Sequence, residues 1–361
     1  MTRDDDLEHR IVAAALHLKE HGWAVVDNVM PQEECTQYVS SVWEWLEGLK
    51  TGVSRADPGT WGPPHWPQSY RGVINTLEVA HADFVWRIRK HPRIRSVFAS
   101  LWGDSRLLSS FDSINVMPPA LSGGPVELPG GSWLHTDQRP SRKGVACIQG
   151  LVNLVDVGFQ AGTGTLLVKD GSHDSHERFF QTACALSPEE RGRVKDWYQF
   201  PSEELPFWEA FESVALDGRA GSMFLWDSRT VHSNKLPERA SAWRHVVYCC
   251  MQPAALATPA DLARKREAWD GYRITTHWPA CNVEVFPDDG ESYYGADAGG
   301  KPQRRAAPPL RTRHRVEDAD LRRLAGVEPY PLEPHPANNG LPRLALLQLP
   351  VAELHRLLER C

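Results

Sequence analysis

The sequence has no surplus of positive charge and no long apolar run. Its 361 residues carry a formal net charge of −6 at pH 7, whereas proteins that bind nucleic acid generically are normally basic. The most apolar stretch near the start, residues 11–18, is interrupted by His17 and flanked by acidic residues. We therefore expect no signal peptide and no membrane span. Both absences argue against a role on nucleic acid or in a membrane.

Cysteines are few and irregularly spaced. Their number is odd, at seven, which predicts reduced thiols in a cytoplasmic protein rather than a disulfide framework. Cys249 and Cys250 are adjacent in an apolar segment, so we expect them to be buried in the core instead of taking part in redox chemistry. Two enzyme signatures are also missing. No serine lies in a nucleophile-elbow pattern, and Gly162-Thr163-Gly164 is too short for a phosphate-binding loop.

What the sequence does contain is an ordinary globular composition, with 41% hydrophobic and 24% charged residues. Apolar residues recur at helical spacing over residues 7–18 and 35–46, and a short strand is expected between them at 23–27. Near the other end of the sequence, helical patterns occur at 258–269, 318–324 and 350–358.

Between these ends, from about residue 107 to 255, short apolar segments alternate with Gly- and Pro-rich turns. Many short strands with few helices between them are typical of a barrel or a sandwich. One helix is expected to interrupt them, because Ser187-Pro188-Glu189-Glu190 matches a capping box. The expected strands are 107–116, 133–137, 145–156, 165–168, 222–226 and 243–251.

We therefore expect an α+β fold with a mainly β core, built as a single domain over residues 1–361. Its parts are N-terminal helices (1–50), an irregular loop (51–73), the β core (about 107–255) and a C-terminal helical extension (256–361).

The irregular loop is rich in Gly, Pro and Trp, and it contains Trp61 and Trp66 of the 14 tryptophans. A loop of this length is either a lid over a pocket or a well-packed surface connection, and the sequence leaves both open. Residues 290–316, rich in Gly, Ala, Pro and Arg, are expected to form a second long loop.

A metal site is indicated by His135-Thr136-Asp137, at the end of an expected strand. Side chains alternate along a strand, so His135 and Asp137 point to the same face. A second histidine from a distant strand would complete the set of two histidines and one carboxylate that suits non-haem Fe(II). The best candidate is His232, which follows the strand expected at 222–226.

Two polar residues stand within apolar strands. Arg244 either binds a carboxylate of a dicarboxylate co-substrate or pairs with an internal acidic residue, because an unpaired buried charge is costly. Arg239 competes for the first role, but it lies in a loop where exposure is expected. Gln149 shares a strand face with Leu151, and its amide needs partners, either a ligand in a pocket or the main chain.

Together these motifs resemble the phytanoyl-CoA dioxygenase-like family of Fe(II)- and 2-oxoglutarate-dependent oxygenases. The likeness lies in the order of His135-x-Asp137, Gln149-Gly150, Gly171-Ser172-His173, Trp226-Asp227-Ser228-Arg229, His232 and Arg244. It spans roughly residues 20–290 and is strongest through 107–255. The resemblance implies a double-stranded β-helix, jelly-roll or cupin-like, with helical additions at both ends.

The resemblance also implies roles for these residues. The Fe(II) ligands would be His135, Asp137 and His232. Arg244 would bind the distal carboxylate of 2-oxoglutarate, and Gln149 would lie near its other end. With dioxygen, such an enzyme hydroxylates, or otherwise oxidises by desaturation or cyclisation, an unactivated C–H bond of a small organic metabolite, often in secondary metabolism. In halogenating relatives a small residue stands at the carboxylate position, so Asp137 predicts oxygenation without halogen transfer.

The substrate is expected to be of medium size with an apolar body. Arg139 lies two residues after Asp137, so on a continuous strand it would point to the same face as His135 and Asp137. It then either points into the pocket and binds an anionic group or, if Pro140 ends the strand, turns to solvent. Trp61 and Trp66 would close the other side of the pocket. Two rival interpretations remain open. One is a β-helix metal enzyme that does not use 2-oxoglutarate, in which Arg244 pairs internally, and the other is a non-catalytic binding protein on the same scaffold.

Overall fold

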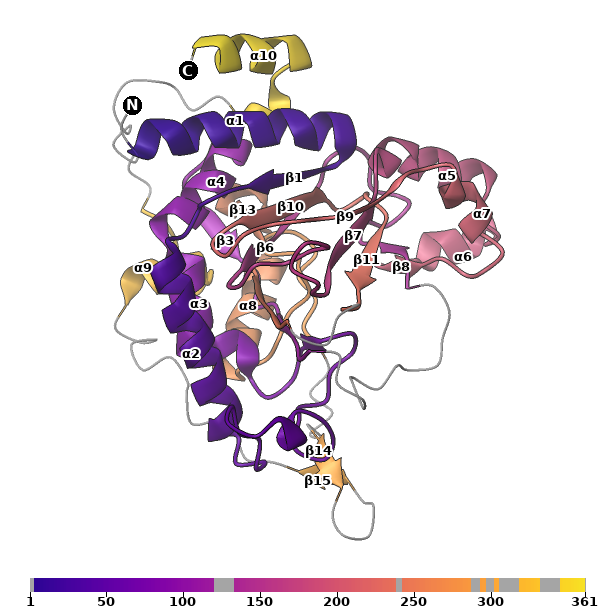
Figure 1. Ribbon diagram of the computed structural model, residues 1–361. Helices are drawn as coiled ribbons and strands as arrows, with labels where there is room; N and C mark the ends of the chain where they lie inside the picture. Colours follow the sequence, from indigo (N-terminus) through magenta and orange to yellow (C-terminus); the bar gives the residue numbers. More distant parts are fainter. Residues whose placement is uncertain are drawn as a thin grey trace.

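The computed structural model describes residues 3–119, 133–237, 242–286, 293–296, 302–304, 318–331 and 345–360. Two antiparallel sheets lie at its centre (Figure 1). The larger sheet consists, in spatial order, of β1 (Trp23–Val26), β10 (Met223–Asp227), β6 (Ile148–Asn153), β12 (Arg244–Tyr248), β4 (Ile114–Met117) and β2 (Val73–Ile74). The smaller sheet consists of β8 (Tyr198–Gln199), β5 (His135–Thr136), β11 (His232–Lys235), β7 (Thr165–Lys169) and β9 (Ser213–Ala215).

The two sheets share one buried apolar cluster. Alternate side chains of a strand point to opposite faces, so every second residue of each sheet points toward the other sheet. Leu151, Trp226 and Val246 come from the larger sheet, and Leu166 and Val168 come from the smaller one. Polar side chains that alternate in step with these apolar residues therefore also point into the space between the two sheets.

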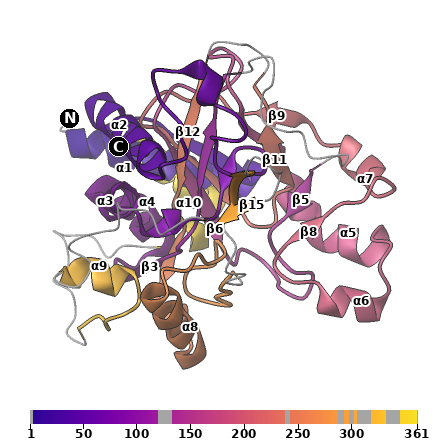
Figure 2. The ribbon, with the colours of Figure 1, turned by 90° about the horizontal axis from the view of Figure 1, so that it is seen from below.

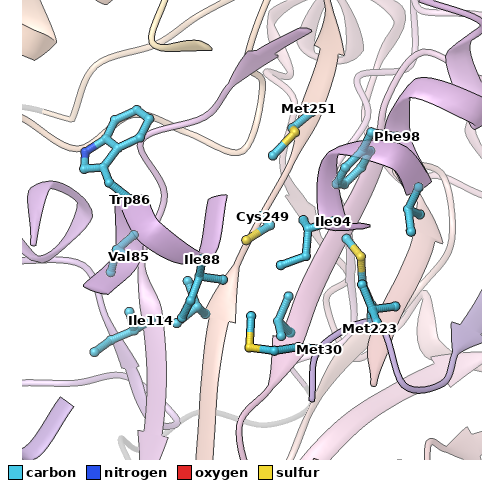
Figure 3. Packing of buried hydrophobic residues seen from close by; sticks show 14 of the residues in the cluster. Met30, Val85, Trp86, Ile88, Ile94, Phe98, Ile114, Met223, Cys249 and Met251 are labelled. Carbon is cyan, nitrogen blue, oxygen red and sulfur yellow. The ribbon is translucent and has the colours of Figure 1, made fainter. Parts of the chain in front are cut away.

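Helices cover the opposite face of the larger sheet (Figures 1 and 2). They are α1 (Arg3–His21), α2 (Gln32–Gly48), α3 (Asp83–Lys90) and α4 (Pro92–Trp102). Figure 3 shows Ile88 of α3 and Phe98 of α4 near Ile114, Met223 and Cys249, within the larger of the buried clusters. This packing fixes the larger sheet against the N-terminal helices and leaves its inner face free to build a site.

The remaining helices lie at the periphery. Three short ones stand beside the smaller sheet: α5 (His176–Thr182), α6 (Pro188–Arg193) and α7 (Leu205–Glu209). The expected capping box is confirmed, because the Ser187 side chain accepts from Glu190 N at the start of α6. The C-terminal helices are α8 (Pro259–Asp270), α9 (Ala319–Leu324) and α10 (Val351–Arg360), and α10 packs on α1.

The helices expected near both ends are confirmed. The observed strands within 133–137, 145–156 and 243–251 are shorter than expected, whereas β7 and β10 match the expected segments 165–168 and 222–226 to within one residue at each end. The segment 107–116 holds two strands, β3 (Leu107–Ser109) and β4, and β3 pairs with β13 (Met251–Pro253). The segment expected as a long loop contains a hairpin of β14 (Tyr293–Ala296) and β15 (Pro302–Arg304), and its other residues lie outside the described ranges. Helices α3 and α4 occupy a stretch for which the sequence pattern predicts no element.

The buried cysteines behave as expected. Cys249 and Cys250 are 0% and 1% exposed, and burial raises the pKa of the Cys249 thiol to about 12. The described cysteines are free thiols. Within the described ranges, no helix combines the length and the apolar character needed to cross a membrane.

Candidate metal centre

Three side chains meet where strands β5 and β11 pair in the smaller sheet. His135 in β5 and His232 in β11 are direct Cα partners in the antiparallel ladder. Asp137 follows β5 directly, and its Oδ2 lies 3.8 Å from His135 Nε2 and 3.2 Å from His232 Nε2. One donor atom from each of the three residues lies within 4.8 Å of the others, and all three residues are buried. The structure thus brings together the two histidines and the carboxylate indicated by the sequence.

Main-chain carbonyl groups orient both imidazoles. His135 Nδ1 lies 2.8 Å from the Trp133 carbonyl oxygen, and His232 Nδ1 lies 2.9 Å from the Thr230 carbonyl oxygen. Because a carbonyl only accepts, each Nδ1 carries the proton and donates it. Each Nε2 therefore keeps a free lone pair, and both lone pairs are available on the side where Asp137 lies. This arrangement is usual for histidines that bind a metal.

The electrostatics of the group favour a bound cation. Burial, together with the neighbouring His232, lowers the pKa of His135 to about 4. Burial alone would raise the pKa of Asp137, but His277, His135 and His232 lower it below its usual range. At neutral pH the group therefore offers a neutral imidazole at His135 and a charged carboxylate, which are the forms that bind a divalent metal.

Gln149 fixes the carboxylate. It projects inward from β6, is 4% exposed, and its Nε2 donates to Asp137 Oδ2 at 2.8 Å. The partner of this buried amide is thus the carboxylate rather than the main chain. Two hydrogen bonds to the Ser228 carbonyl oxygen hold the backbone at Thr136 and Asp137. Asp137 N donates to this oxygen at 2.9 Å, and Thr136 Oγ1 donates to it at 3.1 Å.

Arg244 projects into the same space from β12 and is 1% exposed. Its Nη1 donates to Asn234 Oδ1 at 2.9 Å, while Nε and Nη2 are buried without a partner in the described part of the chain. No described acidic residue forms a salt bridge with it, so the alternative of an internal ion pair is wrong for these residues. Arg239, the competing cation, lies outside the described residues. Two unsatisfied donors on a buried cation indicate a position for an anionic ligand.

A cavity of about 420 Å³ adjoins the metal ligands. Its walls combine aromatic rings with polar groups from strands and loops. The aromatic members are Tyr70, Trp133, Trp197, Trp226, Tyr248 and Phe286. The polar members other than the metal ligands include Asn75, Asp112, Ser113, Gln149, Asp196, Asn234 and His277.

The two tryptophans expected to close this cavity do not line it. Trp61 and Trp66 pack against Trp43, with ring centroids 6.0 and 6.2 Å apart, in the cluster on the helical side of the larger sheet. That expectation is therefore wrong, because both rings pack in an aromatic cluster with Trp43 of helix α2. Tyr70, near the end of the same loop, lines the cavity instead.

Arg139 also takes neither of its two expected positions. Strand β5 ends at Thr136, so the strand parity that would aim Arg139 at the cavity no longer applies. Its side chain pairs with Asp196, with Nη2 at 2.9 Å and Nε at 3.1 Å from Oδ2. Arg142 Nη2 lies 3.5 Å from the same oxygen. Arg139 is therefore engaged by an internal carboxylate and is not an open anion site.

The sequence pattern gives no signal for several cavity residues. Asp112 lies between β3 and β4, whereas His277 and Phe286 lie in the irregular segment after α8. Trp197 directly precedes the short strand β8. These residues meet only in the folded chain, so no local spacing predicts them.

No family model matches the chain. It is 30% identical to Ava biosynthesis cluster protein O of Aspergillus versicolor over 262 residues, which make up 72% of this chain and 83% of that protein. The crystal structure of GlcNAc Inducible Gene 2, GIG2 (DUF1479), from Candida albicans matches with a TM-score of 0.57 at 15% identity, covering 96% of this chain and 81% of the other. The non-heme alpha ketoglutarate dependent carbocyclase SnoK from nogalamycin biosynthesis matches with a TM-score of 0.45 at 20% identity, covering 67% and 83%. The likeness to GIG2 shows a shared fold, and the identity to the Aspergillus protein shows that this chain belongs to the family of Ava biosynthesis cluster protein O.

Proposed function

We propose that the protein is an Fe(II)- and 2-oxoglutarate-dependent dioxygenase of the phytanoyl-CoA dioxygenase-like type. The proposed reaction is hydroxylation of an unactivated C–H bond in a small organic metabolite. The observation that carries the proposal is the buried group of His135, Asp137 and His232, whose donor atoms face one another. Two imidazoles and one carboxylate suit Fe(II) and leave coordination positions for further ligands.

The surroundings of Arg244 support 2-oxoglutarate as the co-substrate. The guanidinium has two buried donors without a partner among the described residues. Its third nitrogen donates to Asn234, which lines the cavity that holds the candidate metal ligands. A carboxylate matches the planar fork of a guanidinium and satisfies both donors at once. A dicarboxylate would then reach from Arg244 toward the metal ligands.

The fold supports the same proposal. Two antiparallel sheets face each other around one apolar cluster, and the candidate metal ligands lie on or directly after strands β5 and β11 of the smaller sheet. We propose that these sheets form a double-stranded β-helix within a single domain. The biosynthetic name of the relative supports a small-molecule substrate and a role in secondary metabolism.

Each part of the chain then has a definite task. Fe(II) and 2-oxoglutarate, when bound, supply the activation of dioxygen and the oxidation of the C–H bond. His135, Asp137 and His232 hold the metal, and Gln149 keeps the carboxylate of Asp137 in one orientation. Arg244 anchors the co-substrate, and the aromatic walls of the cavity orient the substrate and exclude water.

A metal enzyme that does not use 2-oxoglutarate is the alternative. It would have no use for a buried guanidinium with two free donors, and leaving such donors unsatisfied costs about 1–3 kcal/mol each. The observed state of Arg244 therefore favours the 2-oxoglutarate-dependent reaction.

Anaerobic spectroscopy tests the proposal. Wild-type protein reconstituted with Fe(II) should develop, on addition of 2-oxoglutarate, the visible absorption band of Fe(II) chelated by a 2-oxo acid. Admission of dioxygen should then release succinate. His232→Ala should lose both signals, whereas His173→Gln, a change at a buried histidine that contacts Lys19 O and not the cavity, should keep them. Iron binding without the band would favour the alternative, and a band that persists in His232→Ala would contradict the ligand assignment.

A further inference from the structure

One carboxylate on the cavity wall, that of Asp112, forms no salt bridge with a described residue. Asp112 is half-buried, and its Oδ1 accepts from Ser113 N at 2.7 Å and from Ser113 Oγ at 3.0 Å. Arg89 donates to the main-chain oxygen of Asp112 and not to its carboxylate. The second carboxylate oxygen accepts no hydrogen bond from the described residues. Burial accordingly raises the pKa of Asp112, although His277 and Arg89 act against this shift.

The other carboxylates of the cavity are already engaged. Asp137 belongs to the metal group, and Asp196 pairs with Arg139 and Arg142. Among the described residues that line the cavity there is no lysine and no arginine. His277 is within electrostatic range of Asp112 but forms no hydrogen bond with it. Among the described acidic residues that line the cavity, Asp112 is thus the one that neither the metal group nor an arginine engages.

Aromatic rings line the same cavity as this carboxylate, and two of them are largely exposed. Trp197 is 51% exposed and Phe286 is 41% exposed, and both line the cavity. Tyr70 and Trp133 lie edge to face in the wall, with centroids 5.1 Å apart. Large apolar side chains left exposed at a cavity indicate a ligand that covers them. The faces of such rings attract organic cations as well as apolar surfaces.

We propose that the substrate is an organic cation, with a protonated nitrogen that binds Asp112 and a flat apolar body that stacks on the aromatic walls. This inference rests on the proposed function for the reaction, but the recognition step is independent of it. It replaces the expectation of an anionic group near Arg139, because Asp196 occupies that guanidinium.

Three probes with one ring system and different charges test the proposal: tryptamine, indole-3-ethanol and indole-3-acetate. Their binding is measured by calorimetry on protein loaded anaerobically with Fe(II) and saturating 2-oxoglutarate, so that Arg244 is occupied and no turnover occurs. Wild-type protein should bind tryptamine about tenfold or more tightly than the neutral probe and bind the anionic probe most weakly.

The variant Asp112→Asn isolates the charge, because its amide oxygen can still accept from Ser113 N and Oγ. It should lose the preference for tryptamine and keep its affinity for indole-3-ethanol, whereas Asp112→Glu should retain a preference for tryptamine. Asp270→Asn makes the same change of net charge at an exposed position at the end of α8 and should behave as wild type.

Equal affinities of wild type for tryptamine and indole-3-acetate would overturn the proposal, as would tryptamine binding that is unchanged in Asp112→Asn or absent from wild type. The same titrations without Fe(II) and 2-oxoglutarate separate the two claims. If the protein prefers tryptamine to the other two probes but does not bind 2-oxoglutarate, the proposed function is contradicted while the proposed class of substrate stays supported.

Discussion

His232 and His135 are direct partners across strands β11 and β5, and their ring centroids lie 4.2 Å apart. The two strands come from distant parts of the chain, so the pairing register sets the spacing of the two nitrogen donors. A slip of one residue would turn one of the histidines to the opposite face of the sheet. The bonds from Asp137 N and Thr136 Oγ1 to Ser228 O hold this register beside the site.

Gln149 should act on the metal through Asp137. Gln149→Leu removes the donor to Asp137 Oδ2 at nearly constant size, and we expect the affinity for Fe(II) to fall about 10- to 100-fold. Anaerobic competition with a chromophoric chelator measures this affinity. Asn153→Leu is the matched control, because Asn153 is a buried amide on the same face of β6 that bonds to Ser222 instead. Equal losses in the two variants would contradict a specific role for Gln149.

Arg244 should matter for the co-substrate and not for the metal. Arg244→Ala is expected to weaken 2-oxoglutarate binding by about 3–5 kcal/mol, because the carboxylate would lose a buried charged partner. The iron content should stay near that of wild type. Calorimetric titration with 2-oxoglutarate gives the first quantity, and metal analysis gives the second. Arg139→Ala serves as the control, since Arg139 pairs with Asp196. Unchanged affinity in Arg244→Ala would refute the assignment and make Arg239 the next candidate.

Parity along strands explains why the sequence could indicate the metal group. His135 and Asp137 share a face, and Arg244 and Gln149 point inward because their strands alternate regularly through the core. The same argument fails for Arg139, since β5 is only two residues long and ends before it. Contacts between distant segments carry no local signal. The burial of Trp61 against Trp43 and the meeting of Asp112 with His277 therefore had to come from the structure.

A buried lysine away from the site should make stability depend on pH. Lys265 is 0% exposed, its Nζ donates to Ser109 O at 2.6 Å, and burial lowers its pKa from 10.5 to about 7. Below pH 7 both the folded and the unfolded states carry the charge, so the full cost of burying it is present. Between pH 7 and 10.5 the unfolded state binds more protons, and the free energy of unfolding rises with pH.

Lys265→Met removes this contribution. The stability of the variant relative to wild type should therefore be highest below pH 7 and should decrease as the pH rises toward 10.5. Calorimetric melting temperatures of both proteins at pH 6 and pH 10 provide the comparison. A difference that is the same at both pH values would show that the lysine is not titrating in this window.

Asp137 should decide the type of product. As the proposed carboxylate ligand of the metal, Asp137 would leave no coordination position for a halide in its place. We therefore expect an oxygenated product without halogen in buffers that contain chloride or bromide. Mass spectrometry with labelled dioxygen checks this, and a halogenated product from the wild-type enzyme would show that Asp137 does not bind the metal.

The most direct measurement is a crystal structure of the protein grown anaerobically with Fe(II) and 2-oxoglutarate. The account predicts one ion about 2.0–2.2 Å from His135 Nε2, His232 Nε2 and a carboxylate oxygen of Asp137, by analogy with other divalent sites with nitrogen and oxygen ligands. It also predicts a 2-oxoglutarate carboxylate on Nε and Nη2 of Arg244, the two donors that have no partner in the described part of the chain. An ion bound elsewhere, or 2-oxoglutarate bound without contact to Arg244, would contradict it.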